Sequence, residues 1–201
     1  RRNDLPKIQR IDQQQIGSIG GAHEKTVHQG IVIAVRPLEP PHLDDFLGKY
    51  SKKKLRIVLL DQLSDPRNVG AILRSAQAFG VAAVITTFRN SAEENGTLAR
   101  AASGALDNIP FLRVTNLAQA IEKLKNNNIS VVGLTGDGTM PAANLAKIEQ
   151  LAIVLGAEGK GLRRLSRDRC DHLARIDINA CCNSLNVSNA AAIALYAASL
   201  S

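Results

Sequence analysis

From Leu55 onward, apolar runs of strand length alternate with longer segments whose apolar residues recur at helical spacing. This alternation is typical of α/β domains, because neighbouring parallel strands need a crossover connection that is usually a helix. The predicted strands are residues 56–60, 81–86, 109–114, 129–134, 151–155 and 172–176. The predicted helices are residues 68–79, 94–102, 116–125, 162–169 and 186–198. The chain is therefore expected to form an α/β domain built on a parallel sheet.

The chain before this region has a different character. Residues 1–29 are polar and rich in Gln and Gly, and the alternating run 7–11 is a possible strand. Pro37, Pro40 and Pro41 interrupt regular structure before a short helical stretch at 43–50, so a domain boundary is expected between residues 40 and 50. The first residues carry no Met and lead into no apolar segment, so we expect no signal peptide and a chain that begins inside a longer parent.

The charge balance favours a polyanionic partner. Lys and Arg number 25 against 18 Asp and Glu, a formal net charge of +7, and such a basic chain is suited to RNA or DNA. Aromatic residues make up only 3%, so recognition through charge and backbone contacts is favoured over stacked aromatic platforms. The run Lys52, Lys53 and Lys54 is either a phosphate-contacting patch or a solvated face.

Cysteine and histidine positions argue against a metal site. The three cysteines have no C-x-x-C spacing, and the four histidines form no metal-ligand spacing with them. No run approaches the roughly 20 apolar residues of a membrane helix. The expectation is therefore a cytoplasmic protein with reduced thiols, no metal and no membrane partner.

Three polar segments follow predicted strands and could carry chemistry. The first is residues 61–70 with Arg74, where Arg67, Gly70, Arg74 and Gln77 share one helical stripe. Two guanidinium groups beside a helix N-terminus suit phosphate, and a capped helix with solvated arginines is the alternative.

The second segment, residues 151–162, is a strand followed by a glycine-rich loop. Its glycine spacing matches neither the dinucleotide fingerprint nor the P-loop, so the simplest interpretation is a glycine turn capped by Glu158. The third, residues 176–189, contains four Asn and two Ser, which suit a polar ligand or helix capping.

Taken together and in order, these segments resemble the three motifs of the SpoU/TrmH family of RNA ribose 2′-O-methyltransferases. The motif residues are Asp65-Pro-Arg-Asn68-Val-Gly70 with Arg74, then Leu155-Gly-Ala-Glu158-Gly-Lys-Gly161, then Asn183-Ser-Leu-Asn186-Val-Ser188. The lead-in Val27-His-Gln-Gly-Ile31 is similar to the branch that methylates a guanosine of 23S rRNA. Residues 1 to about 36 resemble the end of that branch's L30e-like RNA-binding domain.

The resemblance implies a domain division and a fold. Residues 1–40 would be the remnant of the L30e-like domain plus a linker, and residues 41–201 a SpoU-type catalytic domain. The fold would be an α/β, SPOUT-type parallel sheet with helices on both faces and a C-terminal deep trefoil knot, which is rare among proteins. It also implies a homodimer.

The resemblance further implies site residues and a cofactor, S-adenosylmethionine. Catalytic residues would be Asn68, Arg74, Glu158, Ser184 and Asn186. Cofactor-binding residues would be Leu134, Thr135, Gly136, Leu155, Gly156, Gly161, Ile176, Ile178, Ser184, Leu185 and Val187. RNA-binding residues would be Arg67, Arg74, Lys52, Lys53 and Lys54.

The chain departs from the family pattern before the third motif. Where the family has I-P-M-x-G, this chain has Ile176-Asp177-Ile178-Asn179-Ala180. Aspartate in place of proline is expected to loosen the loop, and alanine in place of glycine requires a φ that alanine can adopt. These two departures are expected to affect the affinity for the cofactor.

The expected reaction is methyl transfer to an RNA ribose 2′-hydroxyl, most simply on a guanosine of 23S rRNA. Because guanidinium groups stay protonated in proteins, we assign Arg74 a charge role at the forming alkoxide or the adjacent phosphate. Asn68 and Asn186 would orient the reacting groups, and Glu158 would hold the arginine or the loop. The alternatives are a tRNA ribose 2′-O-methyltransferase of the same family and a non-catalytic RNA-binding protein.

Overall fold

The computed structural model describes residues 8–16, 30–33, 38–50 and 54–200. Contacts divide the chain into two units, Arg1–Glu39 and Pro40–Ser201. In the described part of the first unit, one helical turn, α1 (Gln13–Ile16), is the only regular element. The strand considered over 7–11 is wrong for residues 8–11, which form no strand with any of the described residues, and Lys7 lies outside the described part of the chain. The L30e-like assignment of this region stays a prediction.

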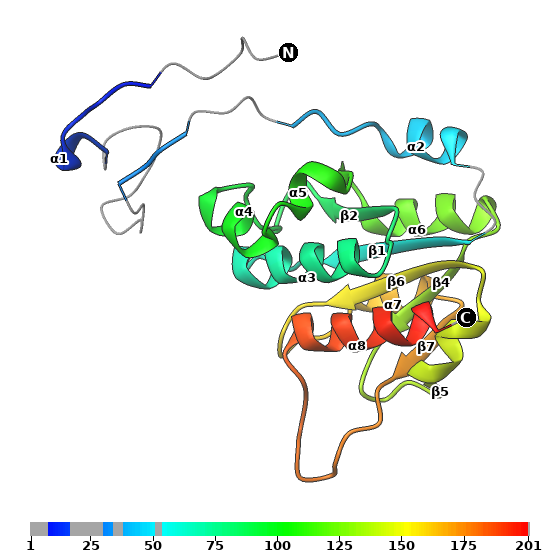
Figure 1. Cartoon of the computed structure of the whole chain (residues 1–201). Coiled ribbons are helices and arrows are strands. Elements are labelled where there is room, and N and C mark those ends of the chain that lie inside the picture. The colour runs from blue at the N-terminus through cyan, green and yellow to red at the C-terminus, as the bar shows by residue number, and fades with distance from the viewer. Residues whose placement is uncertain (1–7, 17–29, 34–37, 51–53, 201) are drawn as a thin grey trace. The chain divides into compact units, whose positions relative to one another are not determined.

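The second unit is built on a parallel sheet of seven strands in the order β3-β2-β1-β6-β4-β7-β5 (Figure 1). This confirms the predicted α/β class, and each of the six predicted strands is present. The one unpredicted strand, β5, has only two residues. The strands are β1 (Leu55–Asp61), β2 (Ala83–Thr87), β3 (Phe111–Val114), β4 (Ser130–Leu134), β5 (Met140–Pro141), β6 (Gln150–Gly156) and β7 (His172–Arg175).

Helices connect the strands and cover the sheet. They are α2 (Leu43–Lys49), α3 (Pro66–Ala78), α4 (Gly96–Ala102), α5 (Ala105–Asn108), α6 (Leu117–Asn126), the 3₁₀ helix η1 (Ala142–Lys147), α7 (Arg164–Arg169) and α8 (Val187–Ser199). The two short elements α5 and η1 were not predicted. The helix predicted over 162–169 begins two residues later, because the loop before it is held by contacts described below.

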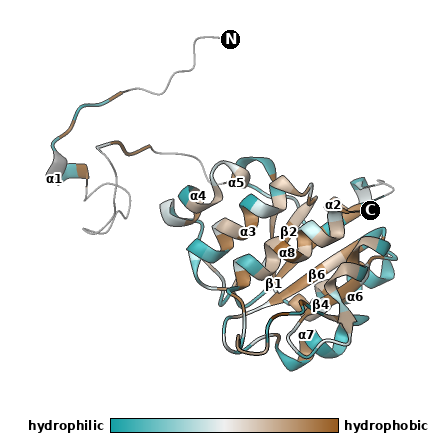
Figure 2. Cartoon of the chain, turned by 60° about the horizontal axis from the view of Figure 1, so that its bottom comes forward, coloured by the Kyte–Doolittle hydropathy of each residue, from teal (hydrophilic) through white to brown (hydrophobic). Residues whose placement is uncertain are grey.

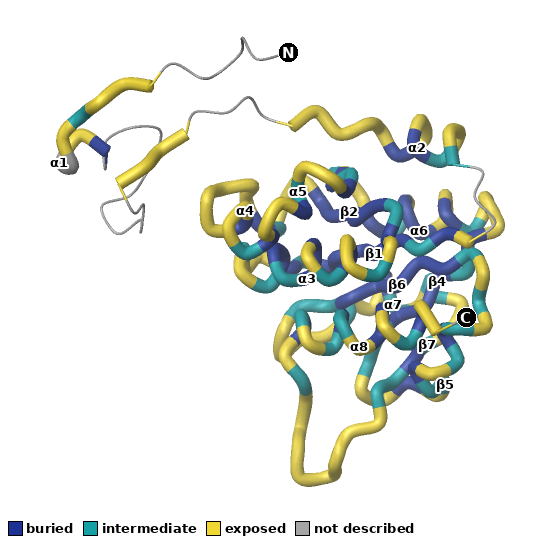
Figure 3. The backbone as a smooth tube through the Cα atoms, in the orientation of Figure 1, coloured by how far each residue is buried: buried dark blue, intermediate teal, exposed yellow. Residues whose placement is uncertain are grey.

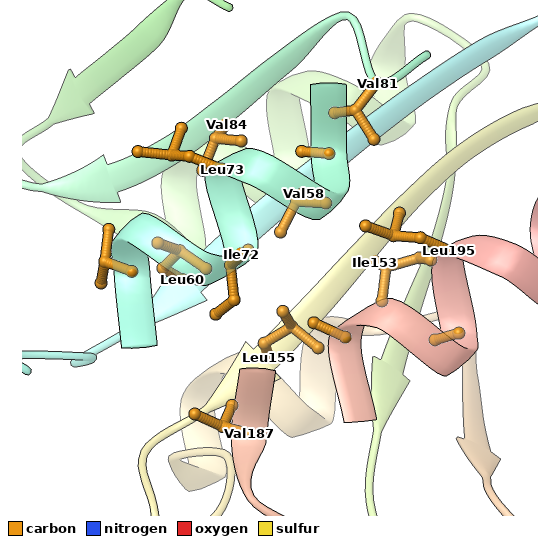
Figure 4. Packing of buried hydrophobic residues seen from close by; sticks show 14 of the residues in the cluster. Val58, Leu60, Ile72, Leu73, Val81, Val84, Ile153, Leu155, Val187 and Leu195 are labelled. Atoms are coloured by element: carbon orange, nitrogen blue, oxygen red, sulfur yellow. The ribbon is translucent and has the colours of Figure 1, made fainter. Parts of the chain in front are cut away.

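Helices lie on both faces of the sheet, and alternate residues of β1 face the two layers. Val58 and Leu60 pack with α3 and α8 in one core, shown in Figure 4. Ile57 and Leu59 pack with α2 and α6 in the other. Figure 2 shows hydrophobic strands beside helices that carry both hydrophilic and hydrophobic residues, and Figure 3 shows the same strands as the most buried part of this unit.

Local capping fixes where the two site helices begin. In α3, Asp65 accepts a hydrogen bond from the N–H of Arg67 at 2.9 Å, and Pro66 occupies the first turn, where no N–H is required. In α8, the Asn186 side chain accepts from the N–H groups of Ser188 and Asn189. The capping role considered for these polar residues is therefore confirmed, and it positions them at the carboxyl edge of the sheet.

The chain makes a close approach where the β4–β5 loop passes β7. Thr135 donates its N–H to the carbonyl of Ala174 at 2.9 Å. A Cβ on Gly138 would lie 2.5 Å from the carbonyl carbon of Ala174, so only glycine fits there. The knot that the family resemblance implies stays a prediction. In the described part of the chain, no helix is long and apolar enough to cross a membrane.

Candidate functional site

A pocket of about 530 Å³ opens at the carboxyl edge of β4 and β6. This is the edge at which ligands bind in open α/β sheets, and the volume lies in the range of small-molecule sites. The lining comes from three stretches: the ends of β4 and β6 with their loops, and the segment between β7 and α8. The lining residues are Leu134, Thr135, Gly136, Leu155, Gly156, Ala157, Glu158, Gly159, Gly161, Ile176, Ile178, Asn183, Ser184, Leu185, Asn186, Val187 and Ala190.

Every residue that the resemblance implied for the cofactor lies in this lining. Of the implied catalytic residues, Glu158, Ser184 and Asn186 also line it, whereas Asn68 and Arg74 lie on α3 outside the lining. The structure thus gathers three segments, within residues 134–190, around one cavity. It adds Ala157, Gly159, Asn183 and Ala190, which sequence reasoning did not assign.

The glycine-rich loop after β6 is tightly closed. Ala157 and Gly161 form an antiparallel bridge, with the N–H of Gly161 donating to the carbonyl of Ala157 at 2.8 Å. A Cβ on Gly156 would lie 2.2 Å from the carbonyl carbon of Gly161 and 2.3 Å from the nitrogen of Leu162. Gly161 has φ of +64°, a conformation that side chains disfavour. Glycine therefore lets backbone form this wall of the pocket.

A buried carboxylate anchors the end of that loop. Asp61, the last residue of β1, has no exposed surface. Its Oδ2 accepts the N–H of Arg163 at 3.0 Å, and its Oδ1 accepts Nε of Arg163 at 2.6 Å. Sequence reasoning assigned no role to this pair. The available signal was a carboxylate placed directly at the end of an apolar strand, because such a group must find a partner when buried.

One side chain joins the three motifs. Asn186 donates from Nδ2 to Oε1 of Glu158 at 2.6 Å and to Oδ1 of Asn68 at 3.1 Å. Asn68 in turn donates to Oδ2 of Asp65 at 3.1 Å. Oδ1 of Asn186 is occupied by the cap of α8, accepting from Ser188. The amide is thus fixed in one orientation at the mouth of the pocket.

The candidate RNA-binding residues differ in what surrounds them. Arg67 and Arg74 are exposed on α3, and within the described residues neither side chain has a hydrogen-bond or ion-pair partner. Lys54 is also exposed. Lys52 and Lys53 lie outside the described residues. The two arginines are therefore available to an anion at the surface of α3.

The segment between β7 and α8, orange in Figure 1 and exposed in Figure 3, contains the departures from the family pattern. Asp177 pairs with Nε of Arg175 at 2.8 Å, so an ion pair stands where the family has proline. Ala180 is not among the described residues with positive φ, so alanine meets no backbone strain there. Ile176 and Ile178 still line the pocket.

Two titratable groups, Asp137 and Cys170, have altered pKa values. Hydrogen bonding from Arg167 lowers the pKa of Asp137, in the loop after β4. Burial raises the pKa of the Cys170 thiol to about 12, which keeps it protonated at neutral pH. Within the described residues, no group of three His, Cys, Asp or Glu side chains could hold a metal ion.

Comparison with known proteins agrees with this geometry. The model of the SpoU rRNA methylase family matches residues 55–196. The 23S rRNA (guanosine-2′-O-)-methyltransferase RlmB of Vibrio vulnificus is 43% identical over 174 residues, covering 85% of this chain and 70% of that protein. A Staphylococcus aureus protein, provisionally named a TrmH family tRNA/rRNA methyltransferase, is 41% identical over 171 residues, covering 84% of this chain and 69% of that protein.

Solved structures share the fold. The SpoU methyltransferase AviRb from Streptomyces viridochromogenes, in complex with the cofactor AdoMet, matches with a TM-score of 0.70 at 26% identity. The match covers 78% of this chain and 60% of AviRb. An AdoMet-bound rRNA methyltransferase from Sinorhizobium meliloti matches with a TM-score of 0.68 at 26% identity, covering 76% of this chain and 59% of that protein. The chain thus spans about 60% of the length of these solved structures.

Proposed function

The chain belongs to the SpoU rRNA methylase family, and from that premise we propose that it transfers a methyl group from S-adenosylmethionine to a ribose 2′-hydroxyl of RNA. The substrate we propose is a guanosine of 23S rRNA, the substrate in the name of the Vibrio vulnificus relative. Such a reaction takes place in the cytoplasm, where ribosomal RNA is found. The basic net charge of +7 supports a polyanionic substrate.

The observation that carries the proposal is the hydrogen-bonded linkage at the pocket mouth. Asn186 joins Glu158 and Asn68 through one amide nitrogen, so one residue of each motif meets beside the cavity. An isolated helix cap would need only the contacts that Asn186 makes within α8. Its two further contacts, to Glu158 in the loop after β6 and to Asn68 in α3, hold the three motifs in one arrangement.

The pocket suits the proposed cofactor. Its aliphatic side chains, including Leu134, Leu155, Ile176 and Leu185, offer apolar surface for an adenine ring. The close approach of Gly156 to Gly161 leaves backbone, and no side chain, along one wall. The bound cofactor would supply an electrophilic methyl group on a sulfonium. The residues that would hold it are those already implied by the resemblance, all of which line the cavity.

The residues around the mouth would orient the ribose. We assign Asn68 and Asn186 to hold the ribose, because their amides are held by hydrogen bonds and cost little reorganisation. Arg74 has no partner for its side chain among the described residues, so its charge can stabilise the oxygen from which the proton leaves or grip the neighbouring phosphate. Glu158 fixes Asn186, and Ser184 lies exposed on the pocket wall.

Arg74→Ala tests this assignment. We expect unchanged S-adenosylmethionine binding in calorimetry and a turnover reduced roughly 100-fold or more, since removing one electrostatic stabiliser costs about that much. Lys147→Ala, which removes an exposed charge at the last residue of η1, before the amino end of β6, is the matched control. Near-normal turnover of Arg74→Ala would contradict the role.

A tRNA substrate is the alternative that the tRNA/rRNA name of the Staphylococcus aureus relative supports. The two substrates are separated by supplying labelled S-adenosylmethionine with purified 23S rRNA or with total tRNA. Label on 23S rRNA alone supports the proposal, and label on tRNA alone contradicts it. A non-catalytic RNA-binding protein would transfer no label and would have no reason to bind the cofactor.

We also propose a homodimer formed through α8. Two apolar side chains of this helix and one at its C-cap point into solvent at spacings of three and four residues: Ile193 is 42% exposed, Tyr196 55% and the C-cap residue Leu200 64%. Residues at this spacing share one helix face. An aligned apolar stripe of this kind on a surface helix marks an interface.

A further inference from the structure

The most exposed aromatic side chain of the protein lies at the carboxyl edge of the sheet. The chain has four Phe, two Tyr and no Trp, and Phe88, directly after β2, is 62% exposed. Phe46 pairs with Tyr50, and Phe79 contacts Tyr196. Within the described residues Phe88 has no such ring contact. The ring therefore presents an open aromatic face to solvent.

The loop that carries Phe88 is closed by hydrogen bonds. The N–H of Phe88 donates to the carbonyl of Val114 at 3.1 Å. Thr87 Oγ1 donates to the carbonyl of Arg89 at 2.7 Å, and Ser91 Oγ donates to the carbonyl of Thr87 at 2.5 Å. These bonds fix the turn around the ring without burying it.

A second set of contacts ties this loop to its neighbours. Arg113 of β3 donates to the carbonyl of Ala92 at 3.0 Å and pairs with Glu94 at 2.9 Å. The N–H of Ala92 donates to the carbonyl of Leu63, in the loop after β1, at 3.0 Å. The ring is therefore presented on a preformed loop, which lowers the ordering cost of binding.

Phe88 lies at the same edge of the sheet as the candidate site. In the sheet, β2 neighbours β1, and β1 neighbours β6. Asn68 follows β1 and Glu158 follows β6, so roughly two strand spacings, about 10 Å, separate the Phe88 loop from the pocket loop. Two exposed arginines, Arg67 in the first turn of α3 and Arg89 in the Phe88 loop, lie at this edge, and neither side chain has a partner among the described residues.

We propose that Phe88 stacks on a nucleobase of the RNA substrate, next to the nucleotide whose ribose enters the site. The inference rests on the proposed function, because it deepens the recognition of the same RNA. An aromatic ring can stack on any base through its π-face, and the adjacent guanidinium groups can hold phosphates. The low aromatic content argued against a platform of several rings, yet a single ring suffices for one base.

A single tryptophan reports this contact directly. Because the chain contains no Trp, Phe88→Trp creates one fluorophore at the proposed stacking position. We expect its emission to be quenched when a 20-nucleotide single-stranded RNA or 23S rRNA is added to saturation. Leu165→Trp, at a 56% exposed position on α7, is the matched control and should show no quenching. Equal emission of Phe88→Trp with and without bound RNA would overturn the proposal.

Steady-state kinetics provide the second test. Phe88→Ala should raise the KM for RNA roughly 5- to 100-fold, the range expected for loss of one stacked base. The kcat and the affinity for S-adenosylmethionine should stay unchanged. Phe88→Trp should restore the KM, whereas Phe88→Leu, apolar but without a ring, should not. An unchanged KM for Phe88→Ala, or rescue by leucine, would contradict stacking.

Salt dependence and molecular mass separate the remaining explanations. Phe88→Ala should leave the slope of log affinity against log salt unchanged, while Arg89→Ala should reduce it by about 0.7. A loss of dimer mass in Phe88→Ala would instead assign the ring to a protein interface and overturn the proposal. RNA could quench the emission of the Phe88→Trp protein while the wild-type protein transfers no methyl group to RNA. In that case the proposed function would fail and the stacking contact would stand.

Discussion

Asp61 is a carboxylate without exposed surface whose two oxygens both accept hydrogen bonds from Arg163. The first of these residues ends β1, where the loop leading to Asn68 begins, and the second closes the glycine-rich loop of the pocket. The pair therefore joins two of the three motifs beneath the surface. Asp61 touches neither the cavity nor an exposed surface, so its effect on the site acts through loop position.

We expect Asp61→Asn to weaken S-adenosylmethionine binding about tenfold and to lower the free energy of unfolding by about 2 kcal/mol, since a buried carboxylate loses its charge-assisted hydrogen bonds to the half-exposed Arg163. Calorimetry and urea unfolding measure the two effects. Asp44→Asn, at an exposed surface pair with Lys123, is the control and should change both quantities much less. Normal cofactor affinity in a destabilised Asp61→Asn protein would reduce the pair to a purely structural role.

The three cysteines differ in reactivity for a physical reason. Burial raises the pKa of the Cys170 thiol to about 12, whereas Cys181 and Cys182 are exposed. Because the thiolate is the nucleophile, iodoacetamide at pH 8 should add two groups to the native protein and three after unfolding in guanidinium. Intact mass spectrometry counts the additions. A native protein that gained the third group as fast as the first two would contradict the buried environment of Cys170.

At the scale of elements, Asp171 connects three of them. Just before β7, its carboxylate accepts the N–H of Val131 in β4 at 2.8 Å and pairs with Lys125 of α6 at 2.9 Å. Burial raises the pKa of Asp171, but the hydrogen bonds from Val131 and Lys125 outweigh burial, and the net pKa is lowered. Its stabilising contribution is therefore complete above the unfolded-state pKa and is lost as the pH falls through the lower folded-state value.

Asp171→Asn should accordingly lower the free energy of unfolding by about 1 kcal/mol at pH 7, after allowance for partial solvent screening. The difference from wild type should shrink as the pH approaches 3. Urea unfolding at the two pH values checks this. Asp168→Asn, an exposed neighbour on α7, should show little difference at either pH. If the difference in the free energy of unfolding between Asp171→Asn and wild type grew as the pH fell, the lowered pKa of Asp171 would be contradicted.

Much of the element order could be predicted from the sequence because it depends on local pattern. The run at 56–60 and the helical spacing of Val69, Ile72 and Leu73 were sufficient for β1 and α3. The two-residue strand β5 carries no periodic signal, so it was missed. Strand order was also beyond local pattern, since β4 lies between β6 and β7, which both follow it in the chain.

For the site, too, some features could be predicted from the sequence and others could not. Motif resemblance indicated the residues that surround the cavity, and each implied cofactor residue lines it. The contact of Asn186 with both Glu158 and Asn68 joins residues up to 118 positions apart, which no spacing reveals. Phe88 was missed because an apolar residue after an apolar strand resembles core until its exposure is known.

For the molecule as a whole, the exposed stripe on α8 predicts assembly. Replacing both Ile193 and Tyr196 by Asp should halve the mass measured by light scattering, because buried unpaired carboxylates would destabilise an apolar interface. Leu165→Asp on α7 removes a comparably exposed apolar group, 56% against 55% for Tyr196, and should leave the mass unchanged. A wild-type chain that remained monomeric at tens of micromolar while binding the cofactor would contradict the dimer.

Arg56, in the first strand of the sheet, donates through its guanidinium to the carbonyl of Ala198, 142 residues later. On the ribosome, β1 is made first among the strands, yet one of its two neighbours, β6, and the helix that receives Arg56 are made near the end. At synthesis rates of roughly 5–20 residues per second, the interval is on the order of 10 s. Until β6 has been made, one edge of the apolar strand β1 has no neighbour, so the nascent domain is most exposed to aggregation before β6 pairs with it.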